Sequence, residues 1–210
     1  MAHPIVYGPA SSPYVWSVRL ALAEKGVVHR LVPVEFGRER EEPHLSRQPF
    51  AKVPAFEHEG FNLYETQAIL RYIDERFSGP ALQSEDVYEW SRMNQMIGIH
   101  DAYAYPAIGA RILRNRISPP LPAKNFAEEA NAAALEMARH CLGEIERLMG
   151  EGPFLAGSEM SLADCMLFPL LSSFARVGEG REIFAERARL SEWLGRIDAR
   201  PSVALTRPEP

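Results

Sequence analysis

The feature that most constrains the fold is a change in the pattern of apolar residues at Ser78-Gly79-Pro80. Before this segment, short strand-like apolar runs alternate with helical patterns, whereas after it every long pattern has the 3.6-residue period of a helix. A change of this kind across a Gly-Pro segment marks a domain boundary. We therefore predict a small α/β domain over residues 1–78, a linker at 79–84 and an all-helical domain over 85–210.

The α/β half is expected to contain a strand, a helix, a second strand, a hairpin and a second helix, in that order. Pro33 places the second strand at a sheet edge, because proline has no N–H to donate to a neighbouring strand. The polar, proline-containing residues 37–49 predict a loop with at most one helical turn. The expected elements are a strand at 5–7, a helix from Ser17 to Gly26, a strand at 29–36, a hairpin that pairs 53–57 with 61–64, and a helix at 66–77.

The second half reads as helices only. Ser161 and Asp164 form a capping box at the start of one of them, so their expected role is structural. The predicted helical segments are 84–117, 126–149, 161–176, 181–188 and 190–199.

Charge and cysteine content narrow the class of protein. A formal net charge of −5, with no long block of one sign, argues against a nucleic-acid surface. No apolar run reaches the roughly 18–20 residues of a membrane span, and the first residues do not resemble a signal peptide, so we expect a cytoplasmic protein. The two cysteines, Cys141 and Cys165, lie in predicted helices, which excludes a disulfide framework and argues against a metal site or a cysteine nucleophile.

Lys52-Val53-Pro54 is the first candidate binding segment, because a proline at the start of a strand is a recognised place for a cis peptide bond. A cis bond would turn the backbone N–H and C=O of Val53 outward, where they can pair with an extended peptide ligand. A trans proline that merely begins an edge strand is the alternative, and spacing alone favours it.

Two further segments lie at predicted helix starts. Glu65-Thr66 offers a helix N-terminus and a hydroxyl to a carboxylate, and a carboxylate to an ammonium group. Ordinary helix capping is the alternative, and for an isolated Glu-Thr pair it is favoured. Ser11, Ser12 and the nearby Tyr7 are hydroxyl donors for a bound thiolate. A capping serine and a core tyrosine are the plain alternatives for these residues.

Five motifs in register resemble the cytosolic glutathione S-transferase family, most closely its serine-type bacterial, theta-like and phi-like members. Pro43 to Phe56 is especially phi-like, and the resemblance covers nearly the whole chain. The motifs are Tyr7 to Tyr14, Val18 to Gly26, Lys52-Val53-Pro54, Tyr64-Glu65-Thr66 with Ala68-Ile69, and Phe154 to Asp164.

The resemblance implies a thioredoxin-like α/β N-terminal domain, an all-α C-terminal domain, and a homodimer that binds one glutathione per subunit without a metal. It also implies a cis bond before Pro54, and a Val53 backbone that pairs with the cysteine of glutathione. Glu65 and Thr66 match the pair that holds the γ-glutamyl head. Arg40 and Lys52 match residues near the glycine carboxylate, for which Arg38 and His44 are alternatives.

Ser12 best matches the serine that donates a hydrogen bond to the glutathione sulfur and so favours the nucleophilic thiolate. Ser11 is the alternative match, and Tyr7 is the reserve candidate. Because the first 140 residues contain no cysteine, the thiol-disulfide chemistry of cysteine-type members is excluded.

The pocket for the second substrate, an electrophile, is expected between the two domains. Asp101 matches an acid that reaches the γ-glutamyl amine across the dimer interface, although a solvated helix carboxylate is an equal alternative. The expected lining residues are Pro13, Tyr14, Phe36, His100, Tyr103, Ile108 and Arg111.

The resemblance therefore predicts a glutathione transferase that attacks a largely apolar electrophile. Glutathione-dependent dehalogenation, isomerisation or ether cleavage on the same fold is one alternative, because these reactions share the activated thiol. A non-catalytic, transferase-like binding or regulatory protein is the other.

Overall fold

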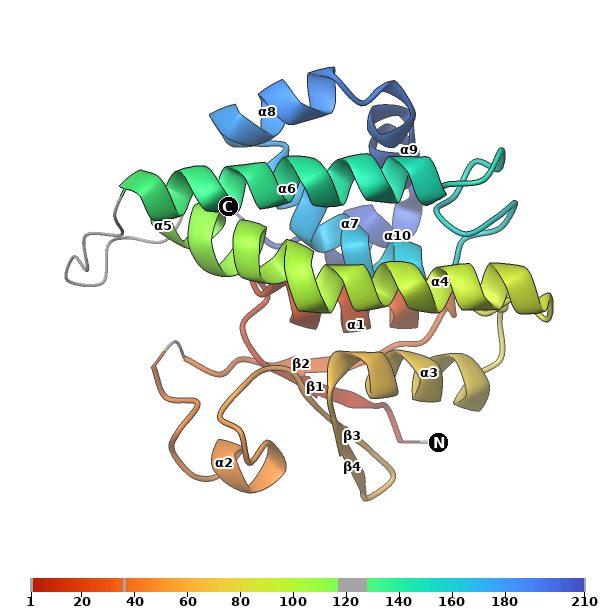
Figure 1. The fold of residues 1–210 in the computed structure, drawn as a ribbon. Helices are drawn as coiled ribbons and strands as arrows, with labels where there is room; N and C mark the ends of the chain where they lie inside the picture. The colour runs from red at the N-terminus through yellow and green to blue at the C-terminus, as the bar shows by residue number, and fades with distance from the viewer. Residues whose placement is uncertain (1, 36, 117–127, 210) are drawn as a thin grey trace. The chain divides into compact units, whose positions relative to one another are not determined.

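The computed structural model describes residues 2–35, 37–116 and 128–209, and of residues 128–130 it describes the backbone only. The chain forms two compact units (Figure 1). The first consists of Met1–Gln83 together with Ala199–Pro210, and the second of Ser84–Asp198. No helix in the described part of the chain is long and apolar enough to cross a membrane.

A four-stranded mixed sheet forms the centre of the first unit, with the order β2-β1-β3-β4. β1 (Ile5–Tyr7) runs parallel to β2 (Arg30–Val32) and antiparallel to β3 (Ala55–His58), which forms a hairpin with β4 (Phe61–Tyr64). The predicted hairpin and the edge position of the second strand are confirmed. β2 is shorter than expected because it ends immediately before Pro33, which has no N–H to continue the ladder.

The main helices of this unit are α1 (Pro13–Glu24) and α3 (Thr66–Arg76), which lie together on one side of the sheet, with the single-turn α2 (His44–Arg47) apart from them (Figure 1). α1 begins four residues earlier than the apolar spacing predicted. Ser12 caps it, and Pro13 suits the first helical position because its fixed φ is already helical.

The C-terminal segment packs with the first unit, whereas the sequence pattern grouped all of 85–210 together. It contains α10 (Pro201–Thr206), which the pattern did not predict. The indole Nε1 of Trp16 on α1 donates to Oγ1 of Thr206 at 3.0 Å. Arg200 forms two hydrogen bonds with the Glu24 carboxylate, at 2.7 and 2.6 Å. These side-chain contacts between distant segments of the chain determine where residues 199–209 lie, and no local pattern encodes them.

The segment that follows α3 is fixed by a buried ion pair. Nζ of Lys25 lies 2.9 Å from Oδ1 of Asp74 and also donates to the carbonyl of Pro80. The same carboxylate accepts from the N–H of Leu82. Gly79, at φ +126°, lies so close to the Lys25 carbonyl that a Cβ would come within 2.9 Å of its oxygen, so this position requires glycine.

Among its described residues the second unit contains helices and connecting loops but no strand, as predicted. Its first long helix starts as α4, continues as a π-helical stretch η1 that contains Pro106, and ends as α5. Proline lacks an N–H and crowds the preceding turn, so a change of helix geometry around Pro106 is physically reasonable. The elements are α4 (Val87–Ile99), η1 (His100–Leu113), α5 (Arg114–Arg116), α6 (Glu128–Leu148), α7 (Leu162–Phe174), α8 (Gly178–Ala185) and α9 (Ala188–Asp198).

Asp164 organises the core of the helical unit. Its fully buried carboxylate accepts from the N–H of Ser161 at 2.8 Å, which confirms the predicted capping box. It also accepts from the N–H of Leu155 at 3.0 Å and from Nε1 of Trp193 on α9 at 2.7 Å. One carboxylate therefore joins the start of α7 to the preceding loop and to α9.

Replacement of Asp164 by alanine should lower the free energy of unfolding by about 3–5 kcal/mol, because several buried donors lose their acceptor. Asp86→Ala is the matched control, because Asp86 caps α4 at an exposed position. It should cost about 1 kcal/mol. Denaturant unfolding measures both, and equal costs would contradict the organising role of Asp164.

Candidate functional site

Three candidate segments meet at one end of the sheet. Tyr7 is paired with Ala55, and Ala55 is paired with Tyr64, so the ends of β1 and β4 flank the start of β3. The Ser12 loop follows Tyr7, Val53-Pro54 immediately precedes Ala55, and Glu65-Thr66 immediately follows Tyr64. The strand register thus gathers residues from three separate stretches of sequence.

Gly8 allows the Ser12 loop to approach Val53. Its φ is +145°, and a Cβ at this position would come within 3.1 Å of Cβ of Val53 and within 2.5 Å of a methyl group of Val15. Only glycine fits here, and the close contact places the turn before α1 directly beside the candidate binding segment.

The Val53–Pro54 peptide bond is cis, as the family resemblance implied, and the trans alternative is wrong. Two buried side chains hold the backbone just before it. Oε1 of Gln48 accepts from the N–H of Phe50 at 2.7 Å and from the N–H of Lys52 at 3.3 Å. Nε2 of His44 lies 2.7 Å from the Lys52 carbonyl oxygen, to which it donates.

Sequence reasoning missed Gln48 and considered His44 only as a ligand contact. Both side chains are buried and serve the loop backbone. In the sequence they are two of many polar residues in the 37–49 loop, and their burial and hydrogen bonds come from the tertiary structure.

Glu65 has an unusual backbone at the start of α3. Its φ of +68° lies in the left-handed region, which is costly for a residue with a Cβ and recurs at functional sites. Its exposed side chain makes no capping hydrogen bond to the helix, whereas Thr66, the first helical residue, is buried. Ordinary capping by Glu65 therefore does not explain this pair.

Ser12 has a hydroxyl whose proton is available. Oγ accepts from the N–H of Val15 at 3.5 Å, as a capping residue does, and a hydroxyl that accepts in this way still has its own hydrogen to donate. Ser11 is the more exposed of the two serines. The capping interpretation and the donor interpretation of Ser12 are thus compatible.

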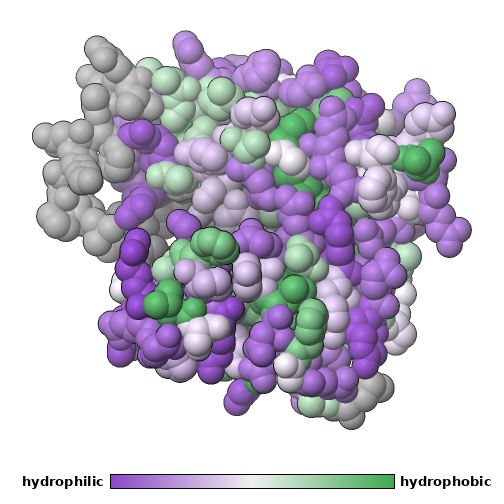
Figure 2. All heavy atoms as spheres, turned by 60° about the horizontal axis from the view of Figure 1, so that its bottom comes forward, coloured by the Kyte–Doolittle hydropathy of each residue, from purple (hydrophilic) through white to green (hydrophobic). Residues whose placement is uncertain are grey.

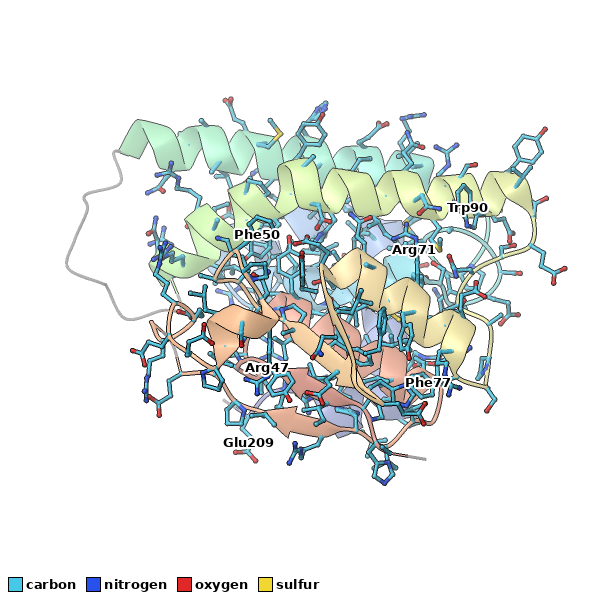
Figure 3. All side chains as sticks on the ribbon, turned by 90° about the horizontal axis from the view of Figure 1, so that it is seen from below. Arg47, Phe50, Arg71, Phe77, Trp90 and Glu209 are labelled. Carbon is cyan, nitrogen blue, oxygen red and sulfur yellow. The ribbon has the colours of Figure 1, made fainter. Side chains whose placement is uncertain are left out.

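The hydroxyl of Tyr7 is already engaged, since it donates to Oε2 of Glu57 at 2.8 Å. Burial, together with this hydrogen bond, raises the pKa of Tyr7. The guanidinium carbon of Arg47, a residue that Figure 3 labels, lies 4.4 Å from the centroid of the Tyr7 ring. The Tyr7 hydroxyl is therefore bound by Glu57 and its ring is covered by Arg47, two contacts that the sequence did not reveal.

The basic candidates differ in their surroundings. Arg40 and Lys52 are exposed. Arg38 instead forms ion pairs with Glu41 at 2.7 Å and with Glu35 at 3.4 Å, so its charge is balanced locally.

The candidate pocket residues fall into the two units, and each group is described by itself. In the first unit Pro13 and Tyr14 open α1 and are partly exposed, whereas Phe36 lies outside the described residues. In the second unit Oδ1 of Asp101 lies 2.9 Å from Nδ1 of the buried His100. Of the remaining three, Tyr103 is exposed, Arg111 is partly exposed and Ile108 is fully buried in the core.

Both cysteines are free and buried. Burial raises the pKa of Cys141 to about 11, so it is a thiol rather than a thiolate near neutral pH. Among the residues that the structure describes, no cluster of three or more His, Cys, Asp or Glu side chains is suited to a metal ion.

Family models match both halves of the chain. The glutathione S-transferase N-terminal domain matches residues 3–75, and the glutathione S-transferase C-terminal domain matches residues 128–196. Together the two matches span about two thirds of the chain, and their order is that of the two predicted domains.

Individual relatives are similar in sequence to this chain along nearly its full length. Glutathione S-transferase F7 of Arabidopsis thaliana is 29% identical over 96% of this chain and 98% of its own length. A glutathione S-transferase of Hyoscyamus muticus is 27% identical over 94% of each chain. The crystal structure of poplar glutathione transferase F1 superposes with a TM-score of 0.86 at 25% identity, over 98% of this chain and 97% of that one.

The four-stranded mixed sheet of the first unit is the thioredoxin-like arrangement that the resemblance implied, and the helical second unit completes the fold. Fold, family models and relatives agree. The chain belongs to the glutathione S-transferase family of enzymes.

Proposed function

We propose that this glutathione S-transferase binds glutathione at the end of the sheet where Tyr7, Ala55 and Tyr64 lie side by side. The strand register is the observation that carries the proposal, because it brings the Ser12 loop, the backbone of Val53 and the N-terminus of α3 to one end of the sheet. In this proposal the domain of residues 1–78 carries the glutathione site and the domain of residues 85–210 carries the electrophile pocket. Residues 79–84 link the two domains.

The Val53 backbone is the proposed contact for the cysteine of glutathione. The cis bond to Pro54 and the two hydrogen bonds that Gln48 accepts fix the direction of the chain at this point. A backbone N–H and C=O of fixed direction can pair with a peptide ligand in the same way that one strand pairs with another.

The γ-glutamyl head requires partners for a carboxylate and an ammonium group. The N-terminus of α3 and the Thr66 hydroxyl supply donors for the carboxylate, and Glu65 supplies a negative charge for the ammonium group. Two features of Glu65 support this role: its side chain does not cap α3, and its backbone is left-handed. Asp101 is a further proposed partner of this amine, contributed by the second subunit.

The glycine carboxylate of glutathione is assigned to Arg40 and Lys52, which are exposed basic side chains. Arg38 is a weaker candidate because two glutamates balance its charge, and His44 is occupied by the Lys52 carbonyl. On a protein with a net charge of −5, the two carboxylates of glutathione need such local positive charges.

Ser12 is the proposed thiol activator, which makes this a serine-type, phi-like member of the family. Its hydroxyl donates a hydrogen bond to the glutathione sulfur while its oxygen caps α1. Lowering a thiol pKa by about two units needs only about 2.7 kcal/mol, which one charge-assisted hydrogen bond and a helix N-terminus can supply. The thiolate then attacks an electrophilic carbon of a largely apolar second substrate in the cytoplasm.

The exposed aromatic side chains of the first unit support a homodimer. Phe50 is 66% exposed, and its ring packs edge-on against the exposed Tyr64 ring at a centroid distance of 6.0 Å. Figure 2 shows that hydrophobic patches interrupt an otherwise largely hydrophilic face. Exposed aromatic groups of this kind are enriched where proteins associate.

Ser12→Ala should lower kcat/KM for conjugation of a chlorodinitrobenzene by about 100-fold near neutral pH, because less glutathione is ionised. The apparent pKa in the pH–rate profile should rise by about two units. Ser11→Ala and Tyr7→Phe are the matched comparisons, and either of them with the larger effect, or an unchanged Ser12→Ala enzyme, would reassign the activator.

Thr66→Val should weaken glutathione binding by about tenfold, because the hydroxyl donor to the γ-glutamyl carboxylate is lost while the side-chain shape is kept. Thr66→Ser retains the hydroxyl and should bind almost as tightly as the wild type. Isothermal titration calorimetry measures both. Equal affinities for the Val and Ser variants would remove Thr66 from the site.

Phe50→Ser should shift the protein from dimer to monomer in light scattering after gel filtration, because it removes the most exposed aromatic side chain among the described residues of the first unit. Tyr88→Ser is the control, since Tyr88 is even more exposed, at 82%, and lies in the helical unit. A wild-type monomer, or an unchanged dimer in Phe50→Ser, would contradict this assignment.

A further inference from the structure

The single-turn helix α2 is too short to hold its own position. It consists of only four residues, and Pro43 at its N-cap position has no side-chain group that could cap it. An isolated helix of one turn is not stable, because its few hydrogen bonds do not offset the entropy lost in ordering it. Contacts with the rest of the first unit must therefore place α2, together with the side chains that hold the segment before Pro54.

Three polar side chains at α2 share one face. His44, Arg47 and Gln48 occupy positions i, i+3 and i+4, which are neighbours on the surface of a helix. His44 and Gln48 are buried, and they hold the backbone of residues 50–52 through the hydrogen bonds described above. A contact that fixes Arg47 therefore also fixes the two residues beside it on this face.

The ring of Tyr7 fixes Arg47. The guanidinium carbon of Arg47 lies 4.4 Å from the centroid of this ring, and its Nη1 donates to the carbonyl of Pro43 at 3.0 Å (Figure 3). Only 6% of Tyr7 is exposed, so little water competes with the attraction between the guanidinium and the face of the ring. Arg47 thus attaches α2 to β1 and also closes the turn that begins at Pro43.

Glu57 holds the other end of the Tyr7 side chain. The Tyr7 hydroxyl donates to Oε2 of Glu57 at 2.8 Å, and burial, together with this hydrogen bond, raises the pKa of Tyr7, so the hydroxyl keeps the proton that it donates. Glu57 lies on β3, where the sheet pairs it with Ile5 of β1. A negative charge at the hydroxyl polarises the ring and strengthens its attraction for a cation. Three side chains in a row therefore connect α2 to two central strands.

We infer that Arg47 is a positioning residue for glutathione: its contact with Tyr7 places α2 so that the buried side chains of that turn present the Val53 backbone to the ligand. The inference rests on the glutathione site proposed above, and it adds a residue that needs no contact with glutathione. It also gives Tyr7 a role other than thiol activation. Loss of Arg47 should weaken glutathione binding and leave the reactivity of the bound thiol, which Ser12 sets, unchanged.

Hydrogen–deuterium exchange without glutathione tests the placement of α2. Arg47→Met keeps an unbranched side chain but loses the positive charge, so the backbone amides of residues 44–52 should exchange about tenfold faster than in the wild type. Arg47→Lys keeps a charge for the ring and should restore most of the protection. Arg76→Met is the matched control, because it removes an exposed ion pair with Glu59 from the same unit, and it should leave these amides unchanged.

Calorimetry tests the consequence for binding. Arg47→Met should weaken glutathione and its glycine monoethyl ester by the same factor, about tenfold, because a displaced α2 disturbs the Val53 contact that both ligands share. Tyr7→Leu removes the ring and should have a similar effect, to which Arg47→Met should add little in the double variant. The KM for glutathione should rise by the same factor, while kcat and the apparent pKa of the pH–rate profile stay unchanged.

Three results would overturn this inference alone. They are unchanged exchange in Arg47→Met, unchanged glutathione affinity despite faster exchange, and a loss of affinity for glutathione but not for the ester. The last result would mean that Arg47 binds the glycine carboxylate directly. A wild type that binds neither ligand would instead overturn the proposed glutathione site, and this inference with it.

Discussion

The pairing of β3 with β1 on one side and β4 on the other is the constraint on which the proposed site depends. It brings the residues after Tyr7, before Ala55 and after Tyr64 to one sheet end. Backbone hydrogen bonds fix this arrangement of the strands, and the buried side chains of Gln48 and His44 hold the segment before Pro54. A slip of one residue in either pairing would turn these strands over and separate the three segments.

Local patterns predicted most of the elements, because strands, turns and helix starts are encoded by neighbouring residues. The hairpin, the helix that begins at Thr66, and the Ser161–Asp164 capping box are all confirmed. The elements that the sequence missed depend on distant contacts. α10 packs through the Trp16–Thr206 hydrogen bond, and no apolar period indicates a helix of six residues.

The residues of the candidate site likewise fall into those that sequence motifs identified and those that only the tertiary structure shows. The motifs that carry the resemblance identified Val53-Pro54 and Glu65-Thr66. The structure confirms the expected cis bond and adds the left-handed backbone of Glu65. Gln48 was not predicted, because its importance comes from where its amide oxygen points rather than from its place in a motif.

A crystal structure of the protein with glutathione tests the central claim most directly. Our account predicts that the Val53 backbone pairs with the cysteine of glutathione, that Glu65 and Thr66 contact the γ-glutamyl head, and that Oγ of Ser12 lies within about 3.5 Å of the sulfur, as sulfur hydrogen bonds are somewhat longer than those to oxygen. Glutathione bound away from this sheet end, or a sulfur held by a group other than the Ser12 hydroxyl, would contradict it.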